Sequence, residues 1–393
     1  MHTPPTPPAS HGSGPVPHRP LSVVIGAGGT GGHIYPGLAL ADALRRALPD
    51  AVISFVGTTR GLEGELIPAA GYRLHTVDMI PFDPSLGARR YLLPAALLKS
   101  GAQCRAILRA QRAQVAVGMG GYPSAPVILG ARLAALPSVI HESNAVPGRA
   151  NQFAARLTPH LAVAFDHSRA HLAGGENALT TGMPIAAPLA GLDRPALREH
   201  ARRMLDVPDG ARLLLVNGGS LGAARLTDAA VGLAHRWRER ADVHLLIKTG
   251  PAALEETRRR LGDSPVARAV PYLDRMDLAY AAADLVVCRA GAATVAELAS
   301  TGVPAVLVPY PHAPGDHQTH NARVLTDAGA GLLLPDAETT AERLDALTAP
   351  LLADPARLAA MSGAADPGPH ARAADLLAAR VIELASHTKE YAA

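Results

Sequence analysis

The fold is decided near the start of the chain by the stretch Leu21-Ser22-Val23-Val24-Ile25-Gly26-Ala27-Gly28-Gly29-Thr30-Gly31-Gly32-His33. A short apolar strand runs into a glycine cluster, an amphipathic helical pattern follows over residues 36–48, and a second strand is expected over 51–56. A strand, a glycine-rich turn, a helix and another strand form a βαβ unit, so the two strands are parallel.

The same order of elements begins again in the second half of the chain. The apolar strand Leu213-Leu214-Leu215-Val216 runs into a second glycine-rich turn, and a helical pattern follows. Other short apolar runs predict strands at 115–117, 138–141, 243–247, 285–287 and 305–308. We therefore predict an α/β fold of two doubly wound, Rossmann-like domains.

Gly182, Pro184 and Pro188 interrupt the periodicity between residues 181 and 192 and mark the expected domain boundary. We assign residues 21–185 to an N-terminal domain and 186–370 to a C-terminal domain. A disordered Pro-rich tail over 1–20 precedes them, and a final helix and tail over 371–393 follow. The helical pattern at 371–386 could pack on either domain.

The composition excludes several classes of protein. The net charge of the 393 residues is only +3 and is spread along the chain, which argues against a nucleic-acid partner. The tail lacks the apolar core of a signal peptide, and no apolar run reaches the roughly 18 residues of a membrane helix. Cys104 and Cys288 are far apart in sequence and indicate neither a disulfide framework nor a metal site. We expect a cytoplasmic protein whose contact with membranes is peripheral.

The first glycine cluster, residues 26–32, is expected to bind an anion. Glycines let backbone N–H groups approach a ligand, and the N-terminus of the next helix adds a favourable dipole. The spacing also matches G-x-G-x-x-G, but no acidic residue follows the strand at 51–56 to hold the ribose of a dinucleotide. His33, at the mouth of the loop, is either a site residue or a helix-start residue that bonds the loop backbone.

Two further groups follow predicted strands of the first half. His141-Glu142-Ser143-Asn144 places polar side chains at the end of one strand, and Gly118-Met119-Gly120-Gly121-Tyr122 ends another. Ligands of open parallel sheets bind at these strand ends, so both groups are candidates for the site.

The second half contains three motifs of this kind. In Asn217-Gly218-Gly219-Ser220-Leu221-Gly222-Ala223, Ser220 could cap the next helix or present N–H groups to a phosphate. In the stretch 289–297, Thr294 and Glu297 fit a capping box, although Glu297 could instead hydrogen-bond sugar hydroxyls. The third motif, Gly315-Asp316-His317-Gln318-Thr319-His320-Asn321, is either a polar loop or part of the site.

Taken together, the motifs G-G-T-G-G-H, G-G-Y, H-E-x-N, G-G-S-x-G-A, C-R-x-G-A-x-T-V-x-E-L and D-H-Q-T-x-N-A occur in this order over residues 21–385. The chain thereby resembles the MurG family, the cell-wall N-acetylglucosaminyltransferases that make lipid II from lipid I. The resemblance implies a glycosyltransferase B fold with its site in the cleft between the domains.

The resemblance also implies roles for individual residues. UDP-N-acetylglucosamine (UDP-GlcNAc) would be held mainly by the second domain, with Glu297 on the ribose and Gln318 on the sugar hydroxyls. The diphosphate would lie against Ser220 and Ala292, Ala293 and Thr294, the uracil near Tyr272 and Leu273, and Asn321 would also line the site. The first-domain side, which faces the lipid-linked acceptor, would be lined by Thr30, Gly31, Gly32, His33 and Asn144.

The implied reaction inverts the anomeric centre and uses neither a metal nor another cofactor, and no D-x-D motif is present. We expect the 4-hydroxyl of the acceptor to attack C1 of the donor sugar as UDP leaves. His33 is the first candidate for the general base because a neutral imidazole has a suitable pKa. Its alternative role is to orient the acceptor, and Asn144 is the second catalytic candidate.

Two positions depart from the family pattern. Leu221 stands where the family usually has Gln, and Ala186 stands where it usually has an Arg near the donor phosphates. These changes suit a divergent homologue with another donor or acceptor, in antibiotic biosynthesis or resistance, as well as a housekeeping enzyme that works with other cell-wall synthesis proteins.

A mixed apolar and basic stretch over residues 79–99 suits a peripheral site on the cytoplasmic face of the membrane, or else a buried helix with a basic edge. Three rival functions agree less well with the sequence. A UDP-sugar 2-epimerase would need several carboxylates in the cleft, an NAD(P)-dependent oxidoreductase lacks its ribose acid, and an inactive scaffold disagrees with the intact motifs.

Overall fold

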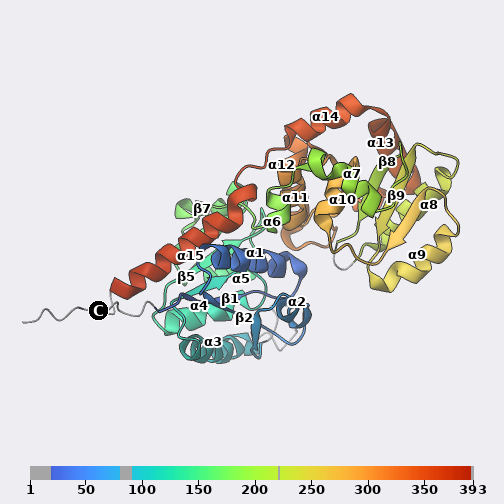
Figure 1. Cartoon of the computed structure of the whole chain (residues 1–393). Coiled ribbons are helices and arrows are strands. Elements are labelled where there is room, and N and C mark those ends of the chain that lie inside the picture. Colours follow the sequence, from blue (N-terminus) through green and yellow to red (C-terminus); the bar gives the residue numbers. More distant parts are fainter. Residues whose placement is uncertain (1–18, 80–90, 220–221, 391–393) are drawn as a thin grey trace, which may run out of the picture.

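The computed structural model describes residues 19–79, 91–219 and 222–390. Most of the predicted tail, Ser220, Leu221 and the 80–90 part of the mixed apolar and basic stretch lie outside these residues. Two lobes follow one another along the chain, each with a sheet between layers of helices (Figure 1).

The first sheet has seven parallel strands in the order β3-β2-β1-β4-β5-β6-β7. Its strands are β1 Ser22–Gly26, β2 Val52–Gly57, β3 Arg73–Thr76, β4 Val115–Gly118, β5 Ser138–Glu142, β6 His160–Val163 and β7 Leu179–Thr180. The helices of this lobe are α1 Gly31–Ala47, α2 Glu63–Ala69, α3 Leu93–Ala110, α4 Ser124–Leu133 and α5 Arg149–Ala154. The chain order reverses direction between β1 and β4, which is the position where ligands bind in doubly wound sheets.

Both faces of this sheet are covered, and side chains alternate between them. Val23 and Ile25 of β1 point to the layer that contains α1, whereas Val24 packs with α3 and α4 on the other face. All five residues of β1 are buried. A parallel strand buried on both faces is apolar along its whole length, which is why the sequence shows continuous apolar runs here.

The second sheet repeats this arrangement with six parallel strands in the order β10-β9-β8-β11-β12-β13. Its strands are β8 Arg212–Asn217, β9 Val243–Lys248, β10 Ala267–Val270, β11 Leu285–Cys288, β12 Ala305–Leu307 and β13 Gly331–Leu333. The helices are α6 Ala187–Ala190, α7 Arg194–Met204, α8 Ala224–Arg236, α9 Leu254–Leu261, α10 Met276–Ala282, α11 Ala292–Thr301, α12 His317–Asp327, α13 Ala341–Ala353 and α14 Pro355–Ala364. The predicted α/β class with two doubly wound sheets is confirmed.

The last helix, α15 Ala373–Glu390, returns to the first lobe and lies along α1 (Figure 1). Leu377, Val381 and Leu384 are buried in the core that α1 forms with the first sheet. The C-terminal helix, which the sequence left open between the two domains, therefore completes the first domain after the chain has built the second.

One local prediction, the start of the first helix, needs correction. The helix predicted to start at Pro36 begins five residues earlier, at Gly31, so Pro36 lies inside α1. The glycines in the first turn of the helix have no apolar side chains, so the helical spacing of apolar residues can be recognised in the sequence only after them. In the described part of the chain, no helix is both long enough and apolar enough to cross a bilayer.

Candidate active site

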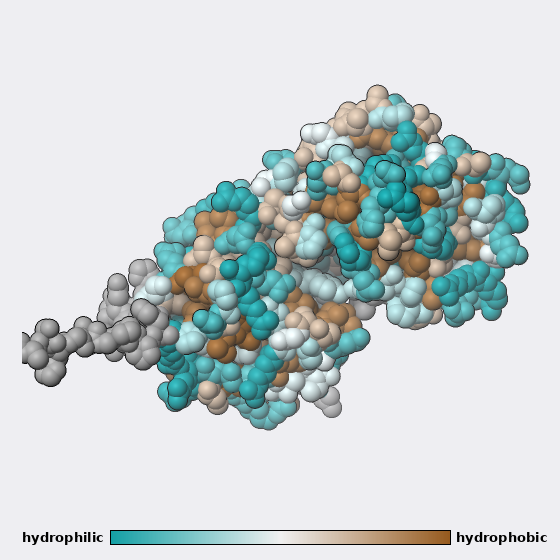
Figure 2. Space-filling view, in the orientation of Figure 1, coloured by the Kyte–Doolittle hydropathy of each residue, from teal (hydrophilic) through white to brown (hydrophobic). Residues whose placement is uncertain are grey.

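The carboxyl ends of both sheets face the junction of the lobes, and the surface is indented there (Figure 2). Contacts across this junction include the following two hydrogen bonds. The hydroxyl groups of Tyr35, on α1, and Tyr272, after β10, form a short hydrogen bond. Asn321 of α12 accepts a hydrogen bond from the backbone N–H of Ala145 at 2.9 Å. The junction brings together the predicted site loops of both halves.

The first glycine-rich turn is held by a carboxylate that the sequence analysis missed. Glu63, the first residue of α2, accepts hydrogen bonds from Gly29 N at 2.9 Å, Thr58 N at 3.0 Å and Thr58 Oγ1 at 2.7 Å. Burial alone would raise the pKa of Glu63, but the hydrogen bonds from Thr58 and Gly29 outweigh it and lower this pKa. An acidic residue does follow β2, and it braces the loop.

The start of α1 lies beside this turn. Thr30 is the exposed N-cap residue, and its side chain makes no capping hydrogen bond. Gly31 is buried and Gly32 is exposed in the first turn of the helix. The free N–H groups of this turn and the positive end of the helix dipole suit an anion or a developing negative charge.

His33 is half-buried in the same first turn. Its Nδ1 lies 3.1 Å from the carbonyl oxygen of Met119. A carbonyl only accepts, so Nδ1 carries the proton and Nε2 keeps its lone pair. Burial lowers the pKa of His33, the hydrogen bond to Met119 opposes this, and nearby His317 adds to the lowering. A neutral imidazole with a free Nε2 can accept a proton.

The loop after β4 reaches His33 only because it contains glycines. Gly120 and Gly121 have φ of +85° and +71°, and a Cβ at Gly120 would lie 2.7 Å from His33 Nδ1. The glycines of the G-M-G-G-Y motif are thus required by both conformation and close approach.

Asn144 lies in the loop after β5 and links the two domains. Its backbone N–H and Nδ2 donate to Oε1 of the buried Glu142 at 2.9 and 3.4 Å, and its Oδ1 accepts from Asn321 Nδ2 at 3.3 Å. Asn321 also donates to the carbonyl of Ala290 at 3.2 Å. The predicted residues Asn144 and Asn321 are brought together, and both are already engaged in a bridge between domains.

The second glycine-rich turn follows β8. Gly219 N donates to Asn217 Oδ1 at 3.0 Å, and the ammonium of Lys248 donates to Gly219 O at 2.9 Å. Ser220 itself lies outside the described residues, and the N-cap position of α8 is occupied by Ala223. Lys248 was not predicted as a site residue, because a single lysine at the end of a strand carries no motif.

The capping-box interpretation of Thr294 and Glu297 is wrong. The N-cap residue of α11 is Gly291, so Ala292, Ala293 and Thr294 form the first turn and Thr294 cannot be the cap. Glu297 accepts a hydrogen bond from the hydroxyl of Tyr280 at 2.9 Å instead. Its carboxylate is therefore not used to cap α11 and is available to a ligand.

Glu297 is an unusual carboxylate. Burial raises its pKa to about 7, against the lowering effects of the Tyr280 hydrogen bond and the charge of Lys248. Carboxylates with strongly raised pKa values in a cleft are candidates for functional roles. Glu297 therefore changes its charge close to neutral pH.

The remaining predicted residues surround the same region. Tyr272 is 43% exposed and Leu273 is buried beside it. Gln318, in the first turn of α12, accepts hydrogen bonds at its Oε1 from Tyr310 N at 2.9 Å and Ala290 N at 3.2 Å. Its Nε2 has no hydrogen-bond partner in the described part of the chain, so two N–H donors remain for a ligand.

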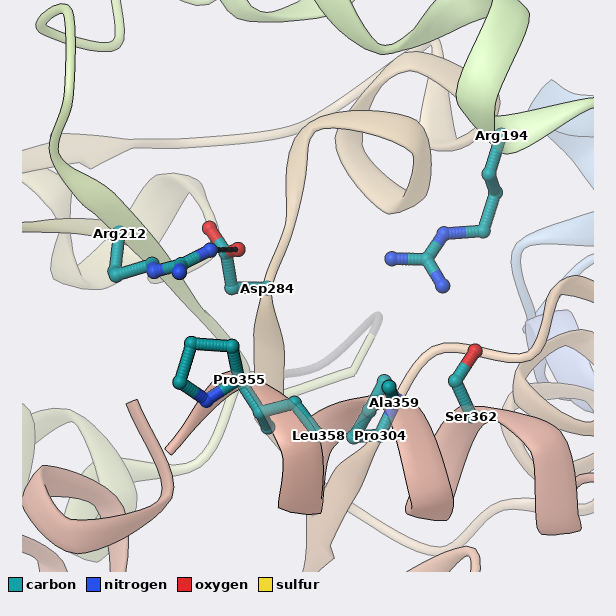
Figure 3. A pocket seen from close by; sticks show the side chains of 8 residues that line it. All are labelled: Arg194, Arg212, Asp284, Pro304, Pro355, Leu358, Ala359 and Ser362. Atoms are coloured by element: carbon teal, nitrogen blue, oxygen red, sulfur yellow. Dashed lines mark hydrogen bonds and ion pairs between the residues drawn. The ribbon is translucent and has the colours of Figure 1, made fainter. Parts of the chain in front are cut away.

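A small cavity lies on another part of the second domain. It encloses about 180 Å³ and is lined by Arg194, Arg212, Asp284, Pro304, Pro355, Leu358, Ala359 and Ser362 (Figure 3). Arg212 opens β8, and Asp284 and Pro304 precede β11 and β12, so this is the amino end of the sheet. Arg194 donates to the carbonyls of Tyr280, Gly302 and Ala283. Arg194 thus ties together the segments around the cavity, which is separate from the site at the carboxyl ends.

Comparisons with known proteins agree with this geometry. Models of the N-terminal and C-terminal domains of glycosyltransferase family 28 match residues 23–162 and 213–377. A relative from Desulforudis audaxviator, named UDP-N-acetylglucosamine--N-acetylmuramyl-(pentapeptide) pyrophosphoryl-undecaprenol N-acetylglucosamine transferase, is 41% identical, covering 87% of this chain and 92% of the relative. A relative of the same name from Mycolicibacterium paratuberculosis is 42% identical, covering 94% and 90%.

The solved structure of MurG from Acinetobacter baumannii superimposes with a TM-score of 0.69 at 27% identity, covering 93% of this chain and all of that one. The chain belongs to the MurG family. The expectation of a glycosyltransferase B fold is thereby confirmed for this MurG-family chain. A putative UDP-N-acetylglucosamine 2-epimerase from Listeria monocytogenes also matches with a TM-score of 0.66, but at 15% identity it shares only the fold.

The described residues of this MurG-family chain contain no group of three or more His, Cys, Asp or Glu side chains that could hold a metal ion. The N-termini of α1 and α11 and the ammonium of Lys248 follow or end strands at the carboxyl edges of the sheets, and groups of these kinds bind phosphates in proteins.

Proposed function

We propose that the protein transfers N-acetylglucosamine from UDP-GlcNAc to the 4-hydroxyl of lipid I, giving lipid II for peptidoglycan synthesis. The observation that carries this proposal is the full-length identity of about 41% to transferases named for this reaction. The intact first-domain loop, with His33 at the start of α1 and Glu63 behind it, supports an active enzyme.

The reaction is a single displacement at the anomeric carbon. The bond between the acceptor O4 and C1 of the sugar forms while the bond between C1 and the diphosphate oxygen breaks, and UDP leaves with the electron pair. The proton of the 4-hydroxyl goes to Nε2 of His33, the nitrogen left free by the hydrogen bond to Met119. Attack from the face opposite the leaving group inverts the anomeric centre.

The second domain supplies the donor site. Glu297 would accept hydrogen bonds from the ribose hydroxyls, and Tyr272 and Leu273 would contact the uracil. The first turn of α11, with Ala292, Ala293 and Thr294, would present its free N–H groups to the diphosphate. Gln318 would meet the sugar by donating through its Nε2, whereas the predicted residue Asn321 is fully buried and its amide is already used in the bridge to the first domain.

The proposed acceptor carries a lipid, so the reaction would take place at a membrane surface, and we assign it to the cytoplasmic face. Around the start of α3, Tyr91, Leu92 and Leu98 are 74%, 56% and 60% exposed, and Lys99 projects from the same helix. Exposed apolar side chains beside a basic one suit insertion among anionic headgroups. Peripheral binding through this helix, near other cell-wall synthesis proteins, is part of the proposal.

The test is product analysis with a lipid I analogue and UDP-GlcNAc. We expect mass spectrometry to show the analogue gain one N-acetylglucosamine, and NMR of the product to show a β linkage to O4. The matched control is the same analogue without its 4-hydroxyl, which should not react. Release of free N-acetylglucosamine without transfer, or transfer to the control, would contradict the proposal.

A further inference from the structure

Lys248 is a buried cation for which the fold provides no counter-charge in direct contact. It ends β9 and is only 6% exposed. Its ammonium donates to two neutral oxygens, Gly219 O at 2.9 Å and Asn217 Oδ1 at 3.4 Å, and none of the ion pairs in the described part of the chain includes it. Burying a charge without an ionic partner is costly, and an anionic ligand in contact with the ammonium would offset this cost.

The surroundings of Lys248 are those of a nucleotide site. Gly219 belongs to the glycine-rich turn between β8 and α8, and the Lys248 ammonium lies 5.2 Å from the ring centre of Tyr272. Glu297 is near enough for the two charges to affect each other's pKa. The Glu297 carboxylate is not in direct contact with the ammonium, whose hydrogen bonds among the described residues go only to neutral oxygens.

The residue type adds a second argument. Lys248 is one of three lysines in the chain, with Lys99 and Lys389, whereas all other basic side chains are arginines. An ammonium is compact and has three N–H donors, of which the two neutral oxygens occupy two. The third donor remains for an anion at the turn.

We propose that Lys248 binds the diphosphate of the nucleotide sugar directly and makes the second domain select a nucleoside diphosphate over an uncharged nucleoside. This inference rests on the proposed function only in placing the nucleotide at the carboxyl ends of β8 and β9. It does not depend on the acceptor.

The experiment compares UDP, UMP and uridine as ligands in isothermal titration calorimetry. For Lys248→Met we expect UDP to bind about 10- to 100-fold more weakly, the loss typical of a hydrogen bond to a charged group. Uridine should bind within about twofold of the wild-type affinity, and Lys248→Arg should recover part of the affinity for UDP. The control is Arg203→Met, which removes an exposed basic side chain on α7 and should change neither affinity.

Two outcomes would overturn the inference. Equal losses for uridine and UDP would mean that Lys248 acts through the base and the Tyr272 ring, and unchanged UDP affinity would mean that it does not touch the ligand. Failure of the proposed function has a different signature, since a chain that binds UDP through Lys248 but does not glycosylate the lipid I analogue leaves this inference intact.

A second measurement titrates the wild-type protein and uses a variant only to assign the NMR signal. Isotope-labelled lysine (¹³C and ¹⁵N) supplied during expression labels the three lysines without altering their ammonium groups, and Lys248→Arg identifies the Lys248 signal by its disappearance. Burial lowers the pKa of Lys248 in the free protein. UDP should raise this pKa while uridine leaves it unchanged, and equal behaviour with both ligands would contradict the contact with phosphate.

Discussion

At the scale of single residues, His33 has the geometry of a base. Its Nδ1 is tied to the carbonyl of Met119, and its Nε2 is left with a lone pair. The side chain is held by a loop whose glycines permit the contact, so its orientation is set before substrate binds. Preorganised groups of this kind are worth more to catalysis than mobile ones.

We predict that His33→Gln lowers kcat by about 10²- to 10⁴-fold, the usual contribution of a general base. Glutamine can still donate to Met119 O, so the loop and the KM for UDP-GlcNAc should change little. Steady-state kinetics with a lipid I analogue measure both values. A large rise in the acceptor KM with kcat preserved would show that His33 only positions the acceptor.

Glu297 leads to a prediction on pH. Its pKa of about 7 means that the carboxylate is ionised above this pH and protonated below it. An ionised carboxylate accepts two ribose hydroxyls, whereas the protonated form loses most of this capacity. Uridine binding should therefore weaken by about tenfold or more between pH 8.5 and pH 5.5.

Uridine is the right ligand for this titration because it carries no phosphate that titrates in the same range. Glu297→Gln should bind uridine weakly at every pH and remove the dependence. A wild-type affinity that is flat with pH would show that Glu297 does not contact the ribose.

How far the sequence predicts the site differs between residues. His33, Asn144 and Gln318 follow strands or glycine turns, so their positions at the sheet edges could be predicted. The positions of Lys248 and Glu63 in the site could not be predicted. Neither residue belongs to a local motif, and only the folded chain brings each one to the site. The capping box failed because its spacing is shared with any T-x-x-E inside a helix, and only the backbone shows that α11 starts at Ala292.

At the scale of elements, the linker between the domains is held by two buried histidines. His141 Nε2 donates to Gly182 O at 2.9 Å, and His370 Nδ1 accepts from Met183 N at 2.9 Å. Gly182 has φ of +80°, and a Cβ there would lie 2.8 Å from His370 N. Burial lowers the pKa of both His141 and His370 to about 4.

These pKa values make stability depend on pH. Between about pH 4 and the ordinary value of 6.5, the unfolded chain binds protons at His141 and His370 that the folded chain does not. The contribution of the two histidines to the free energy of unfolding is therefore complete above pH 6.5. It is lost as the pH drops toward 4, by at most about 3 kcal/mol for each histidine.

Denaturant unfolding at pH 7 and pH 5 measures this effect. The variant His141→Gln/His370→Gln keeps groups that can donate to Gly182 and accept from Met183, and its pH dependence should be shallower. His200→Gln removes an exposed histidine and serves as the control. An unchanged slope in the double variant would mean that the two histidines do not carry the effect.

The strands that the sequence did not reveal share one property. Four of them are the outermost strands of the two sheets, namely β3 Arg73–Thr76, β7 Leu179–Thr180, β10 Ala267–Val270 and β13 Gly331–Leu333. The fifth, β6, lies next to an edge. The four edge strands are short and only partly buried, so they lack the continuous apolar runs of central strands such as β1 and β8. Their pairing depends on the neighbouring strand, which local sequence does not encode.

At the scale of the whole molecule, α15 makes the two domains interdependent. The chain enters the first domain, builds the second and returns to bury Leu377 and Val381 against α1 and the first sheet. Sequence periodicity predicted this helix but not its partner, because an apolar stripe does not specify which of two domains it covers.

We predict that Leu377→Ala lowers the free energy of unfolding by about 2–5 kcal/mol, the range for a large-to-small change in a packed core. Calorimetry should show an earlier transition for the first domain. The control on the same helix is Asp375→Ala, which removes an exposed ion pair with Arg46 and should cost less than about 1 kcal/mol. Equal stability of both variants would mean that α15 does not complete the core.

The most direct test of the central claim is a UDP-release assay with the full chain and a lipid I analogue. UDP-GlcNAc, UDP-GalNAc and UDP-glucose are offered in parallel, with and without EDTA. We predict UDP release that requires the lipid, strongly prefers UDP-GlcNAc and is unchanged by EDTA, since backbone N–H groups, helix N-termini and Lys248 would balance the diphosphate. No lipid-dependent release with any donor, in a protein that still binds UDP, would contradict the assignment to lipid II synthesis.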